Sequence, residues 1–231
     1  MKGFDNLAIN HHLYMALPFQ EAVGVLGDLT YDRSIHHYQF ALHGPPTWFT
    51  LPSGLGCLDF DPANPDWLDC AGATTTDLDF TTEDFSIVAW VNPGDLTANR
   101  MVFCRGFLDV DGYYFVVLID GSIYFITNQG VHQETISSPG DVVINTWQLI
   151  GVSRVDAVAN LYLNGVDVTA TVGVHVDPVT SAREAHVGIY DNEAGSPWSQ
   201  YMWNLRIWGD RALTLADHRY IWETERHWLG V

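Results

Sequence analysis

Three pairs of aspartates in this chain are each two residues apart, a spacing that places both carboxyl groups on the same face of a β-strand. The pairs are Asp59 with Asp61, Asp77 with Asp79, and Asp109 with Asp111. Two such carboxyl groups can act as nucleophile and acid in the hydrolysis of a glycosidic bond. Each pair, however, lies beside turn residues such as Pro62 or Gly112. Because aspartates at such positions form turns and are solvated, we interpret the pairs as turn residues and expect no catalysis from them.

Two histidine doublets, His11-His12 and His36-His37, offer imidazole ligands for a transition metal. Adjacent residues on a strand point to opposite faces, so neither doublet can chelate a metal by itself. The doublets could cooperate only if the first strand and the loop after it come together. We therefore expect structural histidines here rather than a metal centre.

Aromatic side chains are the next group that could bind a ligand. A candidate ligand or partner surface lies around the Gly-Ser-Pro turn at residues 195–197, and it comprises Tyr190, Trp198, Tyr201 and Trp203. Aromatic rings in a loop can stack on a sugar ring or anchor a protein interface. Packing against the first strand or a terminal helix is the alternative for these rings. Trp90 and Trp147, by contrast, lie in strand-like segments and are expected in the core.

The charge balance is strongly acidic. Ten Lys and Arg residues against 28 Asp and Glu residues give a formal net charge of −18. Such a surface repels the phosphates of nucleic acids, so nucleic-acid binding is not expected. It is compatible with divalent cations, with basic protein partners, or simply with solubility.

The chain starts at Met1 without the long apolar run of a secretory signal, and no window has about 18 uninterrupted apolar residues. We expect no signal peptide, no transmembrane segment and no membrane insertion. The cysteines Cys57, Cys70 and Cys104 are sparse and odd in number. This pattern predicts free buried thiols and leaves Cys57 with Cys70 as the pair to test for a disulfide.

Short β-type segments separated by turns run from end to end, which is typical of an all-β sandwich. Residues 85–91 are apolar on both faces and predict a central strand. Asp120-Gly121 and Asn164-Gly165 predict type I′ hairpin turns, and further strands are expected over residues 147–152, 184–190 and 200–208. Thr214 and Asp217 resemble a capping box, which predicts a short helix over residues 215–222. With no linker or repeat, we expect one continuous domain over residues 1–231.

The order of motifs along the chain resembles the laminin-G-like domains of the concanavalin A-like lectin/glucanase superfamily. The resemblance rests on residues 13–24, 31–34, 58–60, 67–69, 80–93, 147–152, 161–165, 204–208 and 211–214. The segment FTTEDFSIVAWVNP at residues 80–93 carries the most recognisable motif. The family implies a two-sheet antiparallel jelly-roll sandwich, here with a short C-terminal helix.

Calcium is the cofactor that the resemblance implies, through an Asp-x-Ser-Gly-Asn loop and an acidic residue near the last strand. Asp32 and Ser34 match this loop, whereas Ile35 and His36 replace its Gly and Asn, and Asn204 stands where the closing Asp is usual. An apolar side chain and an imidazole are poor ligands for a hard cation. The resemblance therefore implies a degenerate site at Asp32, Ser34 and Asn204, with calcium binding left open.

The hydrolases of the superfamily carry Glu-x-Asp-x-Glu or Glu-x-Asp-x-x-Glu on one strand, and this sequence has no such pattern. We therefore expect a non-enzymatic, lectin-like protein. The leading hypothesis is a structural assembly protein on a virion surface, decorating a capsid or associated with a tail, with protein partners and a tendency to form homo-oligomers. In a non-viral setting it would be cytoplasmic or at the cell surface as part of an assembly. The alternative is a carbohydrate-binding lectin or adhesin module with glycan partners. A glycosidase ranks third.

Overall fold

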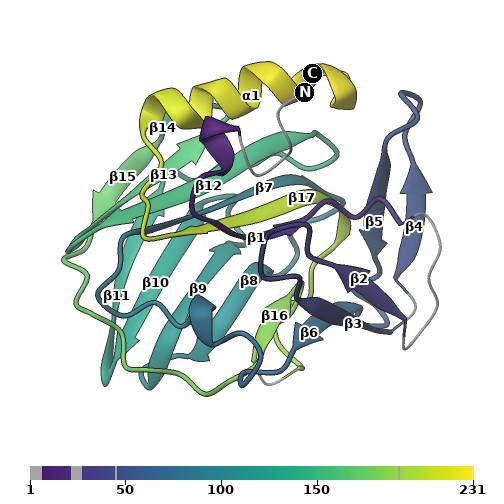
Figure 1. Cartoon of the computed structure of the whole chain (residues 1–231). Helices are drawn as coiled ribbons and strands as arrows, with labels where there is room; N and C mark the ends of the chain where they lie inside the picture. Colours follow the sequence, from purple (N-terminus) through teal and green to yellow (C-terminus); the bar gives the residue numbers. More distant parts are fainter. Residues whose placement is uncertain (1–6, 22–27, 45, 192) are drawn as a thin grey trace.

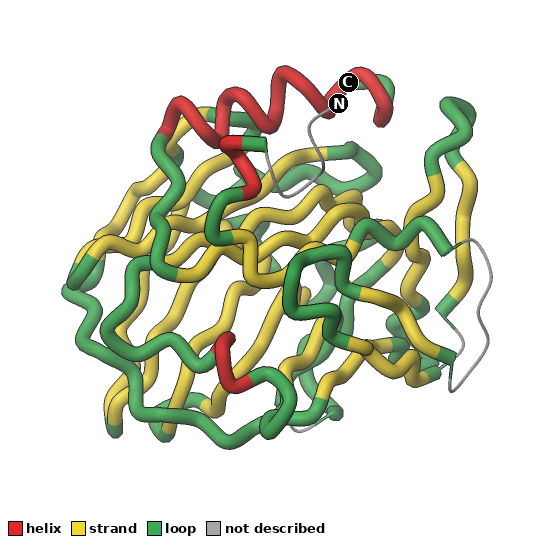
Figure 2. The backbone as a smooth tube through the Cα atoms, viewed as in Figure 1, coloured by secondary structure: helices red, strands yellow, loops and turns green. Residues whose placement is uncertain are grey.

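Short apolar strands fold into two antiparallel β-sheets packed face to face, with one α-helix across the outside of one sheet (Figures 1 and 2). The computed structural model describes residues 7–21, 28–44, 46–191 and 193–231. The predicted fold class, an all-β antiparallel sandwich with a C-terminal helix, is confirmed. Residues 22–24 of the opening motif lie outside the described residues.

Sheet A contains eight strands of the described chain. They are hydrogen-bonded in the order β14 (Val166–Asp167), β13 (Val158–Leu163), β12 (Gln148–Val155), β7 (Phe85–Pro93), β17 (Gln200–Gly209), β5 (Gly56–Phe60) and β4 (Thr47–Thr50), and β1 (Leu13–Leu17) also pairs with β17. All the pairs in this sheet are antiparallel.

Sheet B contains nine strands of the described residues. Their order is β15 (Thr169–Val172), β11 (Val131–Ser137), β10 (Ile123–Gln129), β9 (Asp111–Val117), β8 (Arg100–Phe107), β16 (Ala185–Val187), β6 (Trp67–Cys70), β3 (Gln39–His43) and β2 (Leu29–Tyr31). Two 3₁₀ turns, Ala8–Asn10 and Thr76–Leu78, are also present among the described residues.

Strand β7 is buried on both faces, as the sequence predicts. Phe85, Ile87 and other alternate residues point into the core between the sheets. Val88 and Trp90 point outward into a second apolar cluster between sheet A and the helix. Trp147 is also buried in this second cluster. Continuous burial explains why this strand shows no polar alternation.

The two predicted hairpins differ in their turns. Asn164 and Gly165 have φ angles of 52° and 74°, so the type I′ turn expected between β13 and β14 is confirmed. Between β9 and β10 only Gly121 has positive φ, at 83°. The amide of Gly121 donates to the carbonyl of Leu118, and the amide of Leu118 donates to the carbonyl of Ser122. The prediction of a two-residue I′ turn was wrong here, because a longer loop places only the glycine in the left-handed region.

The α-helix α1 (Leu215–Leu229) is longer than the predicted residues 215–222. The capping box is confirmed: the Thr214 hydroxyl accepts a hydrogen bond from the Asp217 amide, and the Asp217 carboxylate accepts one from the Thr214 amide. The helix continues past Trp222 through good helix formers and ends at Gly230, which is left-handed. Its apolar side packs on the outer face of sheet A.

Two further expectations can be compared with the structure. The strand expected over residues 184–190 is regular only over β16, because the chain turns at Gly188 with φ of 82°. Cys57, Cys70 and Cys104 are buried free thiols, so the pair of Cys57 and Cys70 is not bridged. Burial raises the pKa of Cys57 to about 12 and that of Cys70 to about 11, which keeps both protonated.

Within the described residues, no helix has the length and apolar character needed to cross a bilayer.

Candidate functional site

The outer faces of the two sheets are covered differently. Helix α1 lies across the outer face of sheet A, whereas the outer face of sheet B has no α-helix of the described chain on it (Figure 1). That face carries an apolar cluster of its own, containing Met101, Tyr114 and Val116. An apolar cluster on the side of a sheet away from the main core is a natural place for a ligand.

Strand register explains how this cluster forms. Met101 on β8 pairs with Val116 on β9, and Val116 pairs with Tyr124 on β10. Residues paired directly across antiparallel strands point to the same side, so these three side chains form a row on the outer face. Tyr114, two residues before Val116, lies on that face as well.

The segment after β16 crosses this face and brings Tyr190 to the row. We call residues 188–191 and 193–197 the Tyr190 loop. The amide of Met101 donates to the carbonyl of Ser196 (2.8 Å), and the Tyr190 hydroxyl accepts a hydrogen bond from the amide of Leu108 (2.6 Å). The Tyr190 ring meets the Tyr114 ring edge-on, with centroids 5.6 Å apart. These contacts hold the loop against sheet B.

Arg183 also holds the Tyr190 loop against sheet B. Its guanidinium donates to Asp111 on β9 (2.8 Å) and to Asp191 in the Tyr190 loop (2.7 Å). The same guanidinium lies 5.0 Å from the centre of the Phe107 ring. Arg183 therefore joins the loop to the β8–β9 hairpin by charge and by a cation–π contact.

Between the loop and the sheet lies a hollow of about 170 Å³. Its lining is uncharged and consists of Asn99, Met101, Leu108, Tyr114, Val116, Leu118, Tyr124, Tyr190 and Ser196. Burial raises the pKa of Tyr114, Tyr124 and Tyr190, so all three phenols are neutral at neutral pH. The Tyr124 hydroxyl donates to Glu134, which also raises the pKa of Tyr124.

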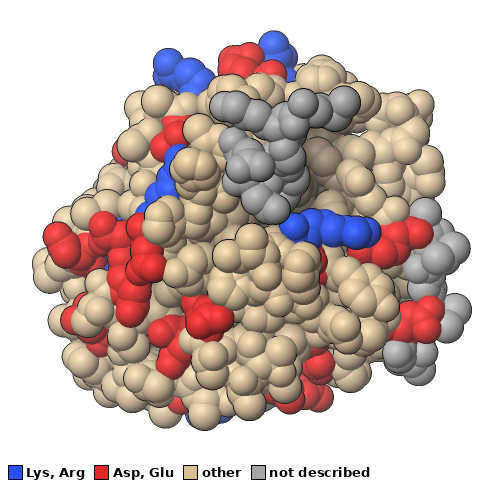
Figure 3. Space-filling model, in the orientation of Figure 1, with Lys and Arg blue, Asp and Glu red and all other residues tan. Residues whose placement is uncertain are grey.

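The charge of the chain as a whole is one-sided. The chain has a formal net charge of −18, and acidic side chains outnumber basic ones on the face drawn in Figure 3. An anionic ligand would be repelled over much of this surface. The uncharged lining together with this field favours a neutral ligand.

The structure separates the four aromatic residues that the sequence singled out. Tyr190 lines the hollow on sheet B. Tyr201 lies on the outer side of sheet A, stacked between Phe49 (4.7 Å) and Trp147 (6.1 Å). Trp198 is fully buried in the main core and has no exposed surface for stacking on a ligand.

Trp203 is also buried, with 5% of its surface exposed, in the cluster beneath helix α1. Trp198 and Trp203 therefore have packing roles, which was the alternative to ligand binding for these aromatic rings. Turn proximity in the sequence did not place the four rings on one surface.

The polar side chains considered as calcium ligands make hydrogen bonds within the protein. Asp32 is 2% exposed, and its carboxylate accepts hydrogen bonds from the amides of Ala16 (2.7 Å), Ser34 (2.8 Å) and Tyr38 (3.3 Å) and from the Ser34 hydroxyl (2.5 Å). Asp32 thus organises its own loop. Calcium binding there stays a prediction.

Asn204 does not join this loop through any contact of the described residues. Its side-chain amide donates to Glu225 on helix α1, at 3.4 Å. The three residues that the resemblance suggested therefore split between a loop beside β1 and the interface between β17 and the helix.

One member of each aspartate pair lies beside a turn and accepts a hydrogen bond from a backbone amide, whereas Asp59 lies on β5 and Asp111 on β9. Asp61 accepts from the amide of Ala63 (2.9 Å), and this contact lowers the pKa of Asp61. Asp79 accepts from the amide of Ser181 (2.8 Å), and Asp109 accepts from the amide of His132 (2.8 Å). These contacts fit the turn interpretation.

The histidine doublets do not assemble a metal centre within the described residues. His11 and His12 border a surface depression together with Ile35. His36 instead pairs with Asp77 (3.1 Å) and stacks on Tyr38.

Sequence reasoning missed Met101, Tyr114, Val116 and Tyr124 as site residues. Their alternation along neighbouring strands is visible in the sequence, since Tyr114 and Val116 are two residues apart. What the sequence lacks is the pairing of β8, β9 and β10 and the position of the Tyr190 loop. Aromatic residues on the outward face of central strands are the sequence signal that could have indicated this site.

A family model described as the concanavalin A-like lectin/glucanases superfamily matches residues 70–217. A comparison with curated protein sequences finds no match.

Solved structures of botulinum neurotoxin binding domains are similar in fold. The binding domain of neurotoxin DC in complex with SialylT has a TM-score of 0.67 at 11% identity, and the same domain in complex with rat synaptotagmin II has a TM-score of 0.68 at 11% identity. Each match covers 94% of this chain and 52% of the toxin chain. The serotype G binding domain has a TM-score of 0.68 at 13% identity, covering 92% of this chain and 51% of the other. The chain thus spans about half the length of these structures and shares their fold.

Proposed function

The chain belongs to the concanavalin A-like lectin/glucanases superfamily, and from that premise we propose that it is a non-catalytic, lectin-like module that binds an uncharged glycan in the hollow on sheet B. The observation that carries this proposal is the convergence of Tyr114, Tyr124 and Tyr190 on one hollow of the uncovered sheet. Tyr114 and Tyr124 come from the β9–β10 hairpin, and Tyr190 comes from a loop that is distant from this hairpin in the sequence.

The lining suits a sugar chemically. A pyranose presents apolar C–H faces and polar hydroxyl edges, and tyrosine offers an aromatic face together with a hydroxyl group. Asn99 and Ser196 add polar groups at the edge of the hollow. Drug-sized ligands occupy about 300–1,000 Å³, so a hollow of about 170 Å³ suits one sugar ring of a longer glycan.

The similar structures are described with glycans and proteins as ligands, which supports a binding role for this chain. Cell entry of botulinum neurotoxin type C is described as dependent upon interaction with two ganglioside molecules, and the binding domain of neurotoxin DC is described in complex with rat synaptotagmin II. Those ligands belong to whole toxin domains, of which this chain matches about half. The net charge of −18 favours a neutral glycan over a sialylated one here.

A binding role without catalysis also fits the carboxylates. Asp61, Asp79 and Asp109 accept hydrogen bonds from backbone amides. None of these residues lines the hollow. Hydrolysis of a glycan by the purified protein would contradict this part of the proposal.

A neutral-glycan array followed by calorimetric titration tests the binding proposal. Tyr190→Ala and Tyr124→Ala should each weaken binding about tenfold or more, because each removes a stacking ring. Tyr220→Ala is the matched control, since Tyr220 is an exposed tyrosine on helix α1 (56% exposed) and should bind like the wild type. Equal weakening in all three variants, or no binding to any neutral glycan, would refute the proposal.

Assembly with protein partners is a second candidate, favoured by an apolar sheet edge. β15 ends sheet B, and Val131, Val172 and Val174 on or beside this edge are 66%, 52% and 75% exposed. An exposed apolar edge can pair with another chain. Capsid decoration or tail association on a virion remains a hypothesis from the sequence that no comparison supports. Light scattering after size exclusion tests assembly: oligomers that a Val172→Asp variant disperses would support it, and a monomeric wild type would contradict self-association.

A further inference from the structure

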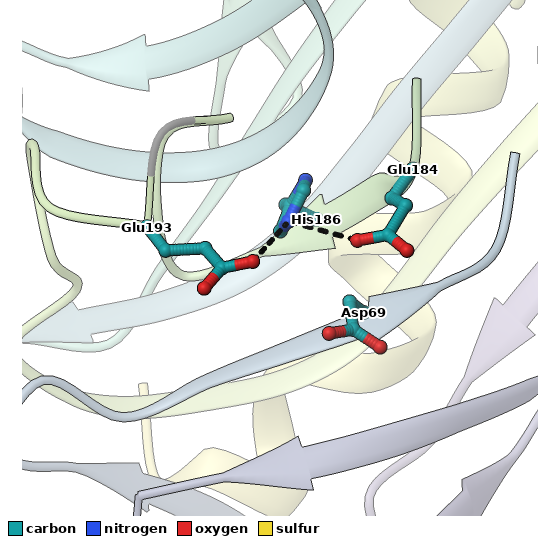
Figure 4. A group of neighbouring side chains, drawn as sticks. All are labelled: Asp69, Glu184, His186 and Glu193. Atoms are coloured by element: carbon teal, nitrogen blue, oxygen red, sulfur yellow. Dashed lines mark ion pairs between the residues drawn. The ribbon is translucent and has the colours of Figure 1, made fainter. Parts of the chain in front are cut away.

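A second group of side chains on sheet B has the composition of a metal site. The ligand atoms of Asp69, Glu184, His186 and Glu193 all lie within 4.8 Å of one another. Figure 4 shows the imidazole of His186 between the carboxylates of Glu184 and Glu193, with Asp69 on the neighbouring strand. The His186 Nε2 atom is 3.8 Å from Glu184 and 4.0 Å from Glu193.

Strand pairing brings these four residues together. His186 on β16 pairs directly with Asp69 on β6, so both side chains point to the same face. Glu184 lies two residues before His186 and shares that direction. Glu193 comes from the Tyr190 loop and closes the group from the other side.

His186 has no other role that accounts for its polar atoms. It is 2% exposed, and neither of its ring nitrogens has a hydrogen-bond partner in the part of the chain that the structure describes. Leaving a buried polar group unpaired costs about 1–3 kcal/mol. A side chain that bears this cost while facing three carboxylates indicates that something binds between them.

We infer that Asp69, Glu184, His186 and Glu193 form a binding site for a divalent transition-metal ion, with Zn²⁺ as its representative. Imidazole nitrogen favours transition metals over Ca²⁺ and Mg²⁺, and carboxylate oxygens complete a mixed ligand set that Zn²⁺ accepts. A divalent cation bound between the three carboxylates also reduces their mutual repulsion.

The distances fit a site that contracts when it binds the ion. With metal–ligand bonds of about 2.1 Å, the ligand atoms of a tetrahedral site lie about 3.4 Å apart. The 3.8 Å and 4.0 Å distances from His186 exceed this separation by well under an ångström, and the limit of 4.8 Å for the whole group exceeds it by about 1.4 Å. Glu184 and Glu193 are about half exposed, at 48% and 49% of their side chains, so they can move inward and leave a path for the ion.

A further histidine supports one of the carboxylates. His43 Nε2 lies 2.6 Å from Asp69 Oδ2, and the His43 ring stacks on Trp67 with centroids 4.9 Å apart. The N–H is not aimed for an ideal hydrogen bond, since this nitrogen also has no hydrogen-bond partner among the described residues. His43 therefore limits the space open to the Asp69 carboxylate by contact rather than by a hydrogen bond.

Calorimetric titration of chelator-stripped full-length protein with ZnCl₂, checked by metal analysis after dialysis, tests the site. We expect one Zn²⁺ per chain in the wild type. His186→Asn should weaken binding at least about tenfold, because it removes the nitrogen ligand. Glu193→Gln should also weaken it about tenfold, and this half-exposed position keeps the test valid if the buried variant does not fold.

His132→Asn is the matched control. His132 also lies beside two carboxylates, Asp109 (2.8 Å) and Glu134 (3.6 Å), but its side chain is one-third exposed (33%) and donates a hydrogen bond within its own group. Its removal should leave the affinity for Zn²⁺ unchanged. Absence of stoichiometric binding, equal affinity in the wild type and His186→Asn, or tighter binding of Ca²⁺ than of Zn²⁺ would each overturn the inference. The test involves no glycan, so its outcome is independent of the proposed lectin function.

Discussion

The imidazole ring of His218 lies flat on the phenol ring of Tyr162, with centroids 3.8 Å apart and an interplanar angle of 17°. His218 is fully buried on helix α1, and its Nε2 atom is 2.9 Å from the hydroxyl of Ser153 on β12. Because Ser153 donates its own proton to the carbonyl of Leu213, it accepts from His218. A neutral imidazole thus ties the helix to sheet A.

This contact predicts a loss of stability in mild acid. Burial lowers the pKa of His218 to about 3 from its ordinary 6.5. Between these values the unfolded chain binds a proton that the folded chain does not, so stability is full above pH 6.5 and falls as the pH drops toward 3. The free energy of unfolding of the wild type should decrease by about 2–4 kcal/mol more than that of His218→Gln between pH 7 and pH 4. Urea unfolding at each pH measures this difference.

His175 supplies the internal reference for that experiment. Burial lowers its pKa to about 4, and both ring nitrogens are bonded to threonines, at 2.8 Å each. Its contribution is the same in the wild type and in His218→Gln, so it cancels in the comparison. Parallel pH profiles for the two proteins would show that His218 does not control acid stability.

Glu225 accepts hydrogen bonds from three side chains at the interface between helix α1 and sheet A. It accepts hydrogen bonds from the Trp90 indole (2.7 Å), from Arg206 (2.8 Å) and from Asn204 (3.4 Å). Glu225→Gln keeps an acceptor for the indole but leaves the buried Arg206 without its counter-charge. We expect a loss of about 2 kcal/mol in the free energy of unfolding. Glu223→Gln, on an exposed pair with Arg226, should change stability by less than about 0.5 kcal/mol.

Asp32 is predicted to act through hydrogen bonds. Asp32→Ala leaves the amides of Ala16 and Ser34 without an acceptor and should cost about 3 kcal/mol, whereas Asp32→Asn should cost less. Thermal unfolding with and without millimolar Ca²⁺ separates this role from calcium binding. A calcium-dependent rise in the melting temperature of the wild type that Asp32→Ala abolishes would instead establish a calcium site.

Asp66 should weaken the fold at neutral pH. It is 1% exposed, its Oδ1 atom has no hydrogen-bond partner among the described residues, and burial raises its pKa to about 6 from 3.8. Between pH 3.8 and pH 6 the folded chain therefore retains a proton on Asp66 that the unfolded chain loses. Stability from the protonated group is full below pH 3.8 and is lost as the pH rises through 6.

The variant Asp66→Asn tests this sign. It keeps an acceptor for the amide of Asp61, which donates to Asp66 at 2.8 Å, and it carries no charge. We expect it to stabilise the protein by about 1–2 kcal/mol at pH 8 and to have little effect at pH 4. A variant less stable than the wild type at pH 8 would mean that the ionised carboxylate has a partner that its hydrogen bonds do not reveal.

Local patterns determined most of the architecture. Continuous apolar character marked β7 as a central strand, Asn164-Gly165 marked a hairpin, and Thr214 with Asp217 marked the start of helix α1. Each of these signals depends on residues a few positions apart, where φ/ψ preference and side-chain direction act directly. The end of the helix and the turn at Gly121 were misjudged, because several local conformations satisfy the same residues there.

The candidate sites depended on contacts that local patterns do not encode. Glu184 lies just before β16 and two residues from His186, but Asp69 meets them only because β16 pairs with β6 more than a hundred residues away. The sequence marked Tyr190 only as an aromatic residue beside a turn. The packing of the Tyr190 loop on β8 and β9 places this ring against Tyr114, whereas Trp198 and Trp203 are buried elsewhere. The sequence by itself determined the fold class, several of the strands with their faces, and the family. Only the tertiary structure decided which faces meet, because strand pairing is set by the global burial of apolar surface rather than by any one segment.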